Sequence, residues 1–177
     1  MIEGLESLND KLDRLGVEDV EAAMRRAMLI VQGAAKAAAP VNKNSGGGGL
    51  RGSIYVDVEI KGETVTGICY TNLDYAKYVE FGTGPAGQAN HAGISPHENV
   101  TYRQTGWIIP AKAMSEADAM AYGFKIMKDK DGQVIGYGTR GQRARPFMYP
   151  ALKNHKKNVL KEFEKTLRKK QREISND

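Results

Sequence analysis

The hydrophobic pattern of this 177-residue chain changes period twice along its length. Apolar residues recur every three or four positions up to residue 38, alternate with polar residues over 54–71, and return to the first spacing after residue 150. Spacings of three and four place side chains on one face of a helix, whereas alternation places them on one face of a strand. A chain with helices at its ends and strands between them is predicted to be α+β.

The first forty residues are predicted to be helical. One stripe consists of four leucines, and a second stripe, rich in Ala and Met, follows Gly16. Residues 1–16 are therefore a candidate N-terminal helical arm. Pro40 ends the second helix, because the residue before a proline is disfavoured in the helical conformation. The two stripes are Leu5, Leu8, Leu12 and Leu15, and then Val20, Met24, Ala27, Val31, Ala34 and Ala38.

A β-hairpin is predicted after the second helix. Residues 42–49 include four consecutive glycines, whose ordering has a large conformational-entropy cost, so this segment is predicted to be a flexible loop. Residues 54–60 and 64–71 alternate as two antiparallel strands joined by a tight turn. A short helix over 74–81 is expected next, with Asp74 as its N-cap.

The chain beyond residue 84 is predicted to be poor in regular structure. Residues 84–106 are rich in Gly, Asn, His and Pro, which predicts a second flexible loop. Weaker strand patterns lie at 107–110, 121–127 and 134–137, and a polar turn lies at 128–132.

Pro150 is suited to the first position of a C-terminal helix. The expected architecture is then an N-terminal helix, an antiparallel sheet built around the hairpin, a short middle helix, and a C-terminal helix packed on the sheet. Residues 1–177 are predicted to form one domain.

The C-terminal helix carries much of the positive charge. Residues 151–177 hold nine basic and four acidic side chains, a net charge of +5, which equals that of the whole chain. Such a helix can bind nucleic acid, or it can be the solvated face of an amphipathic helix. We expect its apolar stripe to pack inward and its cations to face outward. The stripe is Leu152, Leu160, Phe163 and Leu167, and the cations are Lys153, Lys157, Lys161, Lys165 and Arg168.

The residues that usually support catalysis are few in this chain. Its one cysteine, Cys69, excludes an intramolecular disulfide framework and a cysteine-based zinc site. His91, His97 and Glu98 could contact a metal, but their spacing matches no known metal-binding pattern. We predict no enzyme activity, no metal and no cofactor. No apolar run approaches the roughly 20 residues that cross a bilayer, and no signal peptide is recognisable, so we expect assembly in a reducing cytoplasm.

Three patches of sequence carry a family resemblance. The first combines Ala-Pro-Val at 39–41 with GLRGSI at 49–54, the second is YAKYVEFGT at 75–83, and the third is GQRARPFMYPAL at 141–152. In this order they resemble the head–tail joining proteins of long-tailed phages, the gene-product-ten-like family of lambdoid phages. The chain departs from the family pattern in its glycine-rich loop at 42–49, and residues 84–140 match only loosely.

The resemblance implies a structural virion protein of the phage neck. Such a protein joins the DNA-filled head, at its portal or adaptor, to the tail as part of a ring around the DNA channel. The implied partners are copies of the same chain in a ring of six or twelve, an adaptor- or portal-side protein and a tail-terminator-side protein. DNA would pass through the ring without sequence-specific binding, and no membrane is involved. The protein would assemble in the host cytoplasm and reside in the virion neck. The alternative is a small basic nucleic-acid-binding module.

The second and third patches supply the candidate assembly residues. We predict that they contact one another, with Glu80 bound to Arg145 or each held by backbone groups of the other segment. The reason is that an unpaired buried charge costs several kcal/mol. The candidate residues are Tyr75, Tyr78, Glu80, Phe81, Gly82, Thr83, Arg145, Pro146 and Phe147.

Overall fold

The computed structural model describes residues 16–41, 48–62 and 64–175. The predicted arm at 1–16 and the predicted flexible loop at 42–49 therefore lie outside the described residues, apart from their last positions. The chain divides into two compact units, and the prediction of a single domain stays a prediction. The helix–hairpin unit is Met1–Ala39, Leu50–Asn72 and Pro150–Asp177, and the loop-rich unit is Pro40–Gly49 and Leu73–Tyr149.

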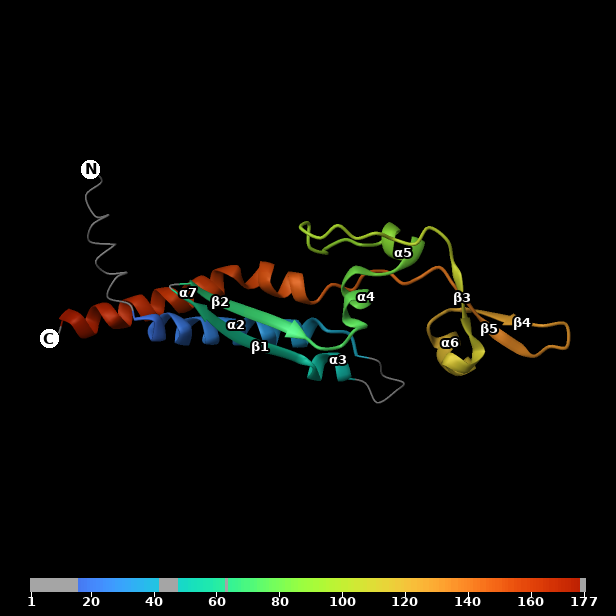
Figure 1. Ribbon diagram of the computed structural model, residues 1–177, viewed down its shortest axis with the longest axis horizontal. Coiled ribbons are helices and arrows are strands. Elements are labelled where there is room, and N and C mark those ends of the chain that lie inside the picture. The colour runs from blue at the N-terminus through green and yellow to red at the C-terminus, as the bar shows by residue number, and fades with distance from the viewer. Residues whose placement is uncertain (1–15, 42–47, 63, 176–177) are drawn as a thin grey trace. The chain divides into compact units, whose positions relative to one another are not determined.

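The helix–hairpin unit is built on helix α2 (Val17–Ala38) and the antiparallel strands β1 (Ile54–Lys61) and β2 (Thr64–Thr71) (Figure 1). The strands pair without a bulge, from Ile54 opposite Thr71 to Lys61 opposite Thr64. α2 packs on both strands through a stripe of buried side chains, which confirms the predicted helix and hairpin. The stripe is Ala23, Ala27, Met28, Val31 and Ala35.

Small residues let α2 approach the hairpin closely. A Cβ atom at Gly67 of β2 would lie 2.6 Å from both Met24 Sδ and Met28 Cγ. Acidic side chains in the first turn and Lys36 in the last turn suit the helix dipole. α2 ends at Ala38, two residues before Pro40, as predicted.

A short helix that was not predicted, α3 (Gly49–Gly52), lies between the predicted loop at 42–49 and the predicted strand at 54–60. Leu50 supplies the buried residue of this turn and is 4% exposed. The Ser53 hydroxyl accounts for the turn's stability, because it donates to the Leu50 carbonyl at 2.9 Å and is also 2.8 Å from the Thr71 hydroxyl. The Ser53 contacts with Leu50 and with Thr71 of β2 therefore stabilise a helical turn that the glycines in it disfavour.

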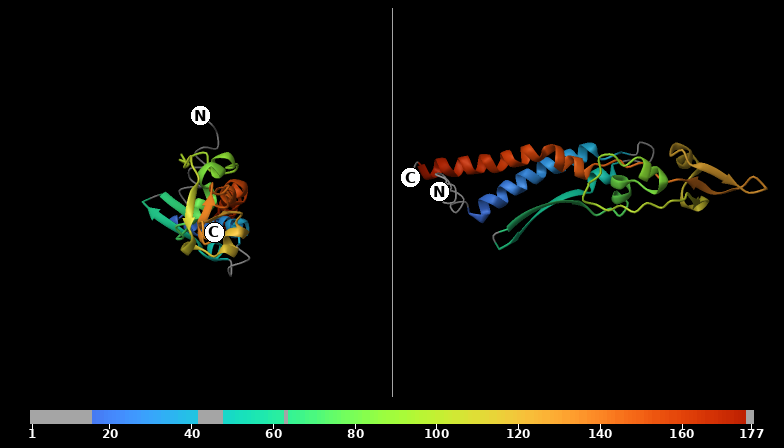
Figure 2. Two further views of the ribbon diagram at one scale, coloured as in Figure 1. Left: turned by 90° about the vertical axis from the view of Figure 1, so that its right-hand side faces the viewer. Right: turned by 90° about the horizontal axis from the view of Figure 1, so that it is seen from above.

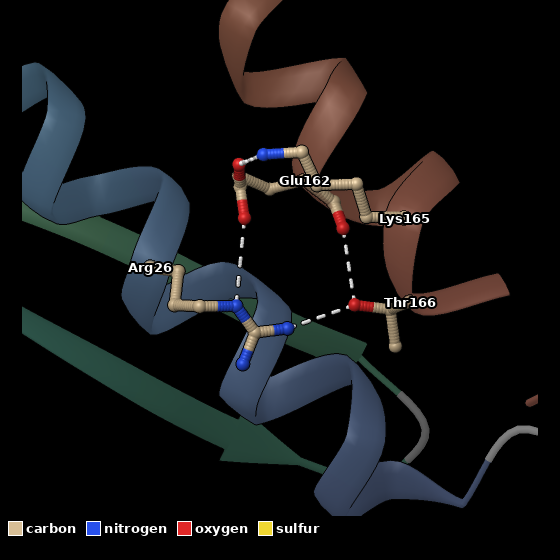
Figure 3. A network of polar contacts seen from close by, with 4 residues as sticks. All are labelled: Arg26, Glu162, Lys165 and Thr166. Atoms are coloured by element: carbon tan, nitrogen blue, oxygen red, sulfur yellow. Dashed lines mark hydrogen bonds and ion pairs between the residues drawn. The ribbon is translucent and has the colours of Figure 1, made fainter. Parts of the chain in front are cut away.

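The C-terminal helix α7 (Met148–Ser175) begins two residues before the predicted start at Pro150. The view from above in Figure 2 shows α2 between this helix and the hairpin. Arg26 of α2 contacts it twice, with Nη2 donating to Thr166 Oγ1 at 2.8 Å and Nε lying 3.5 Å from Glu162 Oε2 (Figure 3).

The predicted apolar stripe of α7 is only half right. Phe163 and Leu167 are half-buried, but Leu152 and Leu160 are 50% and 52% exposed. Val159, which the prediction left out of the packed stripe, is half-buried. The reason is geometric, because Leu160 is rotated by about 100° from Val159 on a helix of 3.6 residues per turn.

The loop-rich unit contains short helices and a small sheet (Figure 1). The antiparallel sheet has the order β3-β5-β4. Its strands are β3 (Trp107–Pro110), β4 (Lys125–Lys128) and β5 (Val134–Thr139), and its helices are α4 (Ala76–Phe81), α5 (Gly84–Ala89), η1 (Ala111–Ala113) and α6 (Glu116–Ala121). With these elements the α+β class predicted from the sequence is confirmed.

Several local predictions in this unit were wrong. α4 begins at Ala76 with Tyr75 as its N-cap, so Asp74 does not cap it. α5 occupies the start of the predicted loop at 84–106. The strand predicted at 121–127 begins only at Lys125, because Ala121 is the last residue of helix α6. That helix was not predicted, and the Ser115 hydroxyl caps it by accepting a hydrogen bond from the Asp118 backbone at 3.1 Å.

The polar turn after β4 is confirmed. The Asp129 carboxylate accepts hydrogen bonds from the backbone N–H groups of Asp131 and Gln133, at 3.0 and 2.8 Å. An Asp side chain that holds backbone groups two and four residues ahead stabilises a tight turn.

Candidate assembly interface

The second and third sequence patches lie against each other in the loop-rich unit. The Arg145 backbone N–H donates to the Val79 carbonyl at 2.8 Å, and the Thr83 N–H donates to the Gln142 carbonyl at 2.8 Å. The Gln142 side chain also donates to the Tyr78 carbonyl at 2.9 Å. The predicted contact between the two segments is therefore present, and backbone groups make most of it.

Glu80 is held at the centre of this contact. Its side chain is only 6% exposed. Its carboxylate accepts three backbone hydrogen bonds, from Phe147 at 2.7 Å and from Met148 and Tyr149 at 3.0 Å each. These N–H groups stand at the start of α7, where the first N–H groups of a helix have no intrahelical acceptor and the helix dipole favours a negative charge. Glu80 thus caps α7 from a distant part of the sequence.

The predicted ion pair between Glu80 and Arg145 is not formed. The Arg145 side chain is exposed, and none of the ion pairs between described residues joins it to Glu80. The second alternative, in which each residue meets backbone of the other segment, holds for both. The physical reason is that three oriented N–H groups already satisfy the buried carboxylate, so it needs no cation.

Two glycines permit this close approach of two backbones. Gly82 has φ +75° and Gly141 has φ +91°, which is the left-handed region that favours glycine. A Cβ atom at Gly82 would lie 2.7 Å from the Ala144 nitrogen, and one at Gly141 would collide with the Thr83 carbonyl oxygen. Neither position accommodates a side chain without a shift of the backbone.

The candidate assembly residues divide into two groups by exposure. Phe147 is fully buried and, with Glu80 and Gly82, it builds the fold. Tyr75 and Tyr78 are 47% and 49% exposed and, like Arg145, lie open to a partner. The remaining three, Phe81, Thr83 and Pro146, are half-buried.

A groove of 720 Å³ lies beside α4 in the same unit. The Tyr102 hydroxyl donates to the Phe81 carbonyl at 2.8 Å, and burial raises the pKa of this phenol. The Arg103 guanidinium lies over the Trp107 ring at 5.5 Å. The sequence reasoning missed this groove, although the aromatic residues spread through the loosely matching insert were a signal for it. Its aromatic lining is Tyr78, Phe81, Tyr102, Trp107 and Phe124.

The side chains that the sequence offered for catalysis or metal binding make packing contacts in the structure. Cys69 is half-buried on β2, and burial raises the pKa of its thiol, although Lys36 nearby acts in the opposite direction. His91 stacks on Tyr102 with ring centroids 5.7 Å apart. Within the part of the chain that the structure describes, no three His, Cys, Asp or Glu side chains gather in a way that could hold a metal ion.

None of the helices described for this chain is both long enough and apolar enough to span a membrane.

The match to a known family covers the first part of this architecture. Residues 2–82 match the family described as "Bacteriophage HK97-gp10, putative tail-component". Through that region the chain is similar to this HK97-gp10-like family. The match takes in α2, the hairpin and α4, and it ends at Gly82 inside the second patch, so the resemblance of residues 141–152 stays a prediction.

The match indicates a general role. The matched family is described as a tail component of a bacteriophage, which indicates a structural component of a phage virion and not an enzyme. Among curated proteins none matches the chain, and among solved structures none does.

Proposed function

We propose that this protein joins the DNA-filled head to the tail in the phage neck, as one subunit of a homo-oligomeric ring around the DNA channel. Its neighbours would be a portal or adaptor protein on the head side and a tail-terminator protein on the other side. The match of residues 2–82 to a family of tail components supports a place in the virion. The more specific role in the neck is inferred from two surfaces that are exposed in the single chain.

The observation that carries the proposal is the exposure of two aromatic rings at the start of α4, one on its N-cap residue and one in its first turn. Tyr75 and Tyr78 stand three residues apart, on a helix whose next turn is fixed by the buried Glu80. Both rings are about half exposed, and Lys77 lies over the Tyr78 ring at 5.2 Å. Tyrosines on a rigid support are typical centres of protein–protein interfaces, because they bury a large area with little loss of side-chain entropy.

The hairpin offers a second uncovered surface. Among the described strands, β1 pairs only with β2, so each has an open edge. Its outer face shows Tyr55 and Tyr70, a cross-strand pair with centroids 5.9 Å apart, each more than two-fifths exposed. Open edges and exposed aromatic pairs are features that soluble monomers usually cover. A ring needs two different complementary surfaces on each subunit, and these two separate surfaces suit that requirement.

Deletion of the protein during phage infection tests the proposed role. We expect DNA-filled heads and complete free tails that do not join, as seen by electron microscopy of lysates. Supplying the unmodified chain from a plasmid should restore joined virions. Joined virions without the protein, or the absence of tails, would show that it does not act at the neck.

Substitutions at the exposed tyrosines test the interface itself. The variant Tyr75→Ala/Tyr78→Ala should fold normally, since both rings are half exposed, but should fail to restore joining. The matched control is Met120→Ala, which removes a side chain that is 60% exposed elsewhere in the same unit. Sedimentation should show fewer oligomers for the tyrosine variant alone. Normal joining by that variant would remove α4 from the interface.

A further inference from the structure

The exposed side of α7 carries an uninterrupted row of positive charge. Successive spacings of four, four, three and four residues bring five side chains within about 80° of arc on a helix of 3.6 residues per turn. No other residue between positions 157 and 172 falls inside this arc, and Glu164 lies about 20° beyond its edge. The basic row consists of Lys157, Lys161, Lys165, Arg168 and Arg172.

The basic row faces away from the rest of the helix–hairpin unit. On its opposite side, Glu162 and Thr166 of α7 contact Arg26 of α2 (Figure 3). The Lys170 amine on that side is 3.2 Å from the carboxylate of Asp19, also in α2. All five cations of the row are exposed. Contacts with α2 therefore fix which side of α7 is turned outward, and that side is the basic one.

The charge of the row is mostly uncompensated. Lys165 is paired with Glu162 at 2.6 Å, yet its side chain remains 70% exposed. No acidic side chain among the described residues forms an ion pair with the other four cations. Like charges three and four residues apart destabilise a helix. The row therefore opposes helix formation in the free chain, and a bound polyanion would remove that repulsion.

We propose that the basic row of α7 binds the phosphate backbone of double-stranded DNA without reading its sequence. Arg172 follows Lys157 by fifteen positions, so the row is about 22 Å long at 1.5 Å per residue. Phosphates follow one another every 3.4 Å along a DNA strand, so a row of this length spans about six of them. The row consists only of Lys and Arg, which contact phosphates, and it contains no aromatic side chain that could stack on a base and no amide that could pair with adenine.

This inference rests on the charge and exposure of α7, and it does not depend on the proposed role at the neck. A failure to bind DNA would leave the deletion experiment above unaffected. A failure of that experiment would likewise leave the DNA-binding surface in place elsewhere in the virion.

Salt-dependent binding of the full-length protein to a labelled 20-base-pair duplex of random sequence tests the inference. If all five cations neutralise phosphates, the slope of log K against log salt should be about −4.5, at about −0.9 per phosphate contact. The variant Lys157→Gln/Lys161→Gln/Arg168→Gln should reduce the slope to about −1.8 and weaken binding on the order of 100-fold at 0.1 M salt. Gln keeps the helix propensity of Lys and Arg, so the helix should persist.

Two control variants test whether binding depends on the basic row or only on the total positive charge of the protein. Lys128→Gln/Lys156→Gln/Lys169→Gln removes the same charge from exposed positions outside the row, and should leave the slope within about one unit of the unmodified protein. Lys157→Arg/Lys161→Arg/Arg168→Lys keeps the charge, and should bind like the unmodified protein. An equal loss in the off-row control, or a slope shallower than about −1 for the unmodified protein, would overturn the inference.

A competitor distinguishes DNA from an acidic protein partner. Unlabelled duplex should displace the label much more effectively than poly-glutamate of equal total charge, because the duplex presents its phosphates at fixed spacing. Equal displacement by the two would assign the row to an acidic polypeptide and overturn the DNA assignment.

Discussion

The helix–hairpin unit and the loop-rich unit are held together by different kinds of contact. In the first, apolar side chains of α2 pack on a regular hairpin, and flexible methionines fill the space above Gly67. In the second, the contact between 78–90 and 140–149 consists largely of backbone hydrogen bonds around a buried carboxylate. The first unit can adjust to a change by moving side chains, whereas the second can adjust only by moving backbone. The loop-rich unit should therefore be the more sensitive of the two to small substitutions.

Two phenylalanines give the largest expected difference. Phe147 of the loop-rich unit is fully buried, so Phe147→Ala should lower the free energy of unfolding by about 4 kcal/mol. Phe163 of α7 is only half-buried, so Phe163→Ala should cost about 1–2 kcal/mol, less than a fully buried ring would. Urea denaturation measures both. Equal losses would contradict the comparison between the units.

The next comparison is between a glycine packed against backbone and a glycine packed against side chains. Gly141→Ala should cost about 3 kcal/mol, because a Cβ there collides with the Thr83 carbonyl and φ is positive. Gly67→Ala should cost about 1 kcal/mol, because the atoms it meets belong to Met24 and Met28. The measurement is again urea denaturation. A cost for Gly67→Ala as large as that for Gly141→Ala would show that the two units are equally rigid.

The Glu80 cap should have a smaller effect. Glu80→Ala removes an acceptor from three backbone N–H groups, and we expect a loss of about 2 kcal/mol. The control Glu98→Ala changes an exposed carboxylate of the same unit and should be near neutral. Hydrogen exchange of the Phe147, Met148 and Tyr149 amides gives a local measurement. Unchanged protection in Glu80→Ala would show that the carboxylate does not hold the start of α7.

The smallest expected effect concerns acid pH in the helix–hairpin unit. The hydrogen bond from Lys165, followed by the charges of Lys165 and Arg26, holds the pKa of Glu162 below its ordinary value of 4.5. Because the folded chain then binds fewer protons than the unfolded chain near pH 4.5, the contribution of Glu162 is present above that pH and is lost as the pH falls below it. Thermal unfolding of Glu162→Gln between pH 7 and 3 should depend less on pH than that of the unmodified protein. Glu164→Gln, an exposed control on the same helix, should not flatten the curve to the same degree.

Much of the helix–hairpin unit could be predicted because its pattern is local. The alternation at 54–71 and the Ala and Met spacing of α2 each report one face of one element. The same reasoning failed for Leu152 and Leu160, since a pattern shows that a helix has an apolar side but not which residues a partner covers. In the loop-rich unit, α5 was missed because its glycines, Gly84 and Gly87, pack against Arg140 and Gln142, which are distant in sequence. The cap of α6 is local, since Ser115 binds Asp118 three residues ahead, and the prediction overlooked that signal.

The Glu80 site shows where prediction from sequence reached its limit. The need to satisfy a buried carboxylate predicted that 75–83 and 145–151 would meet. The groups that donate to the carboxylate could not be predicted, because any cation or any set of N–H groups can satisfy it. Only the folded chain shows that the donors are the first N–H groups of α7, which leaves Arg145 exposed.

The sequence by itself determined the α+β class, the two strands of the hairpin and the outward direction of the α7 cations, because periodicity and charge are properties of neighbouring residues. The tertiary structure decided which apolar residues of α7 are covered, which tyrosines stay exposed and what holds Glu80. Those outcomes depend on contacts such as Arg26 with Glu162 and Glu80 with Phe147, whose partners are far apart in the chain. Such contacts form only where the fold brings the partners together, so no local pattern encodes them.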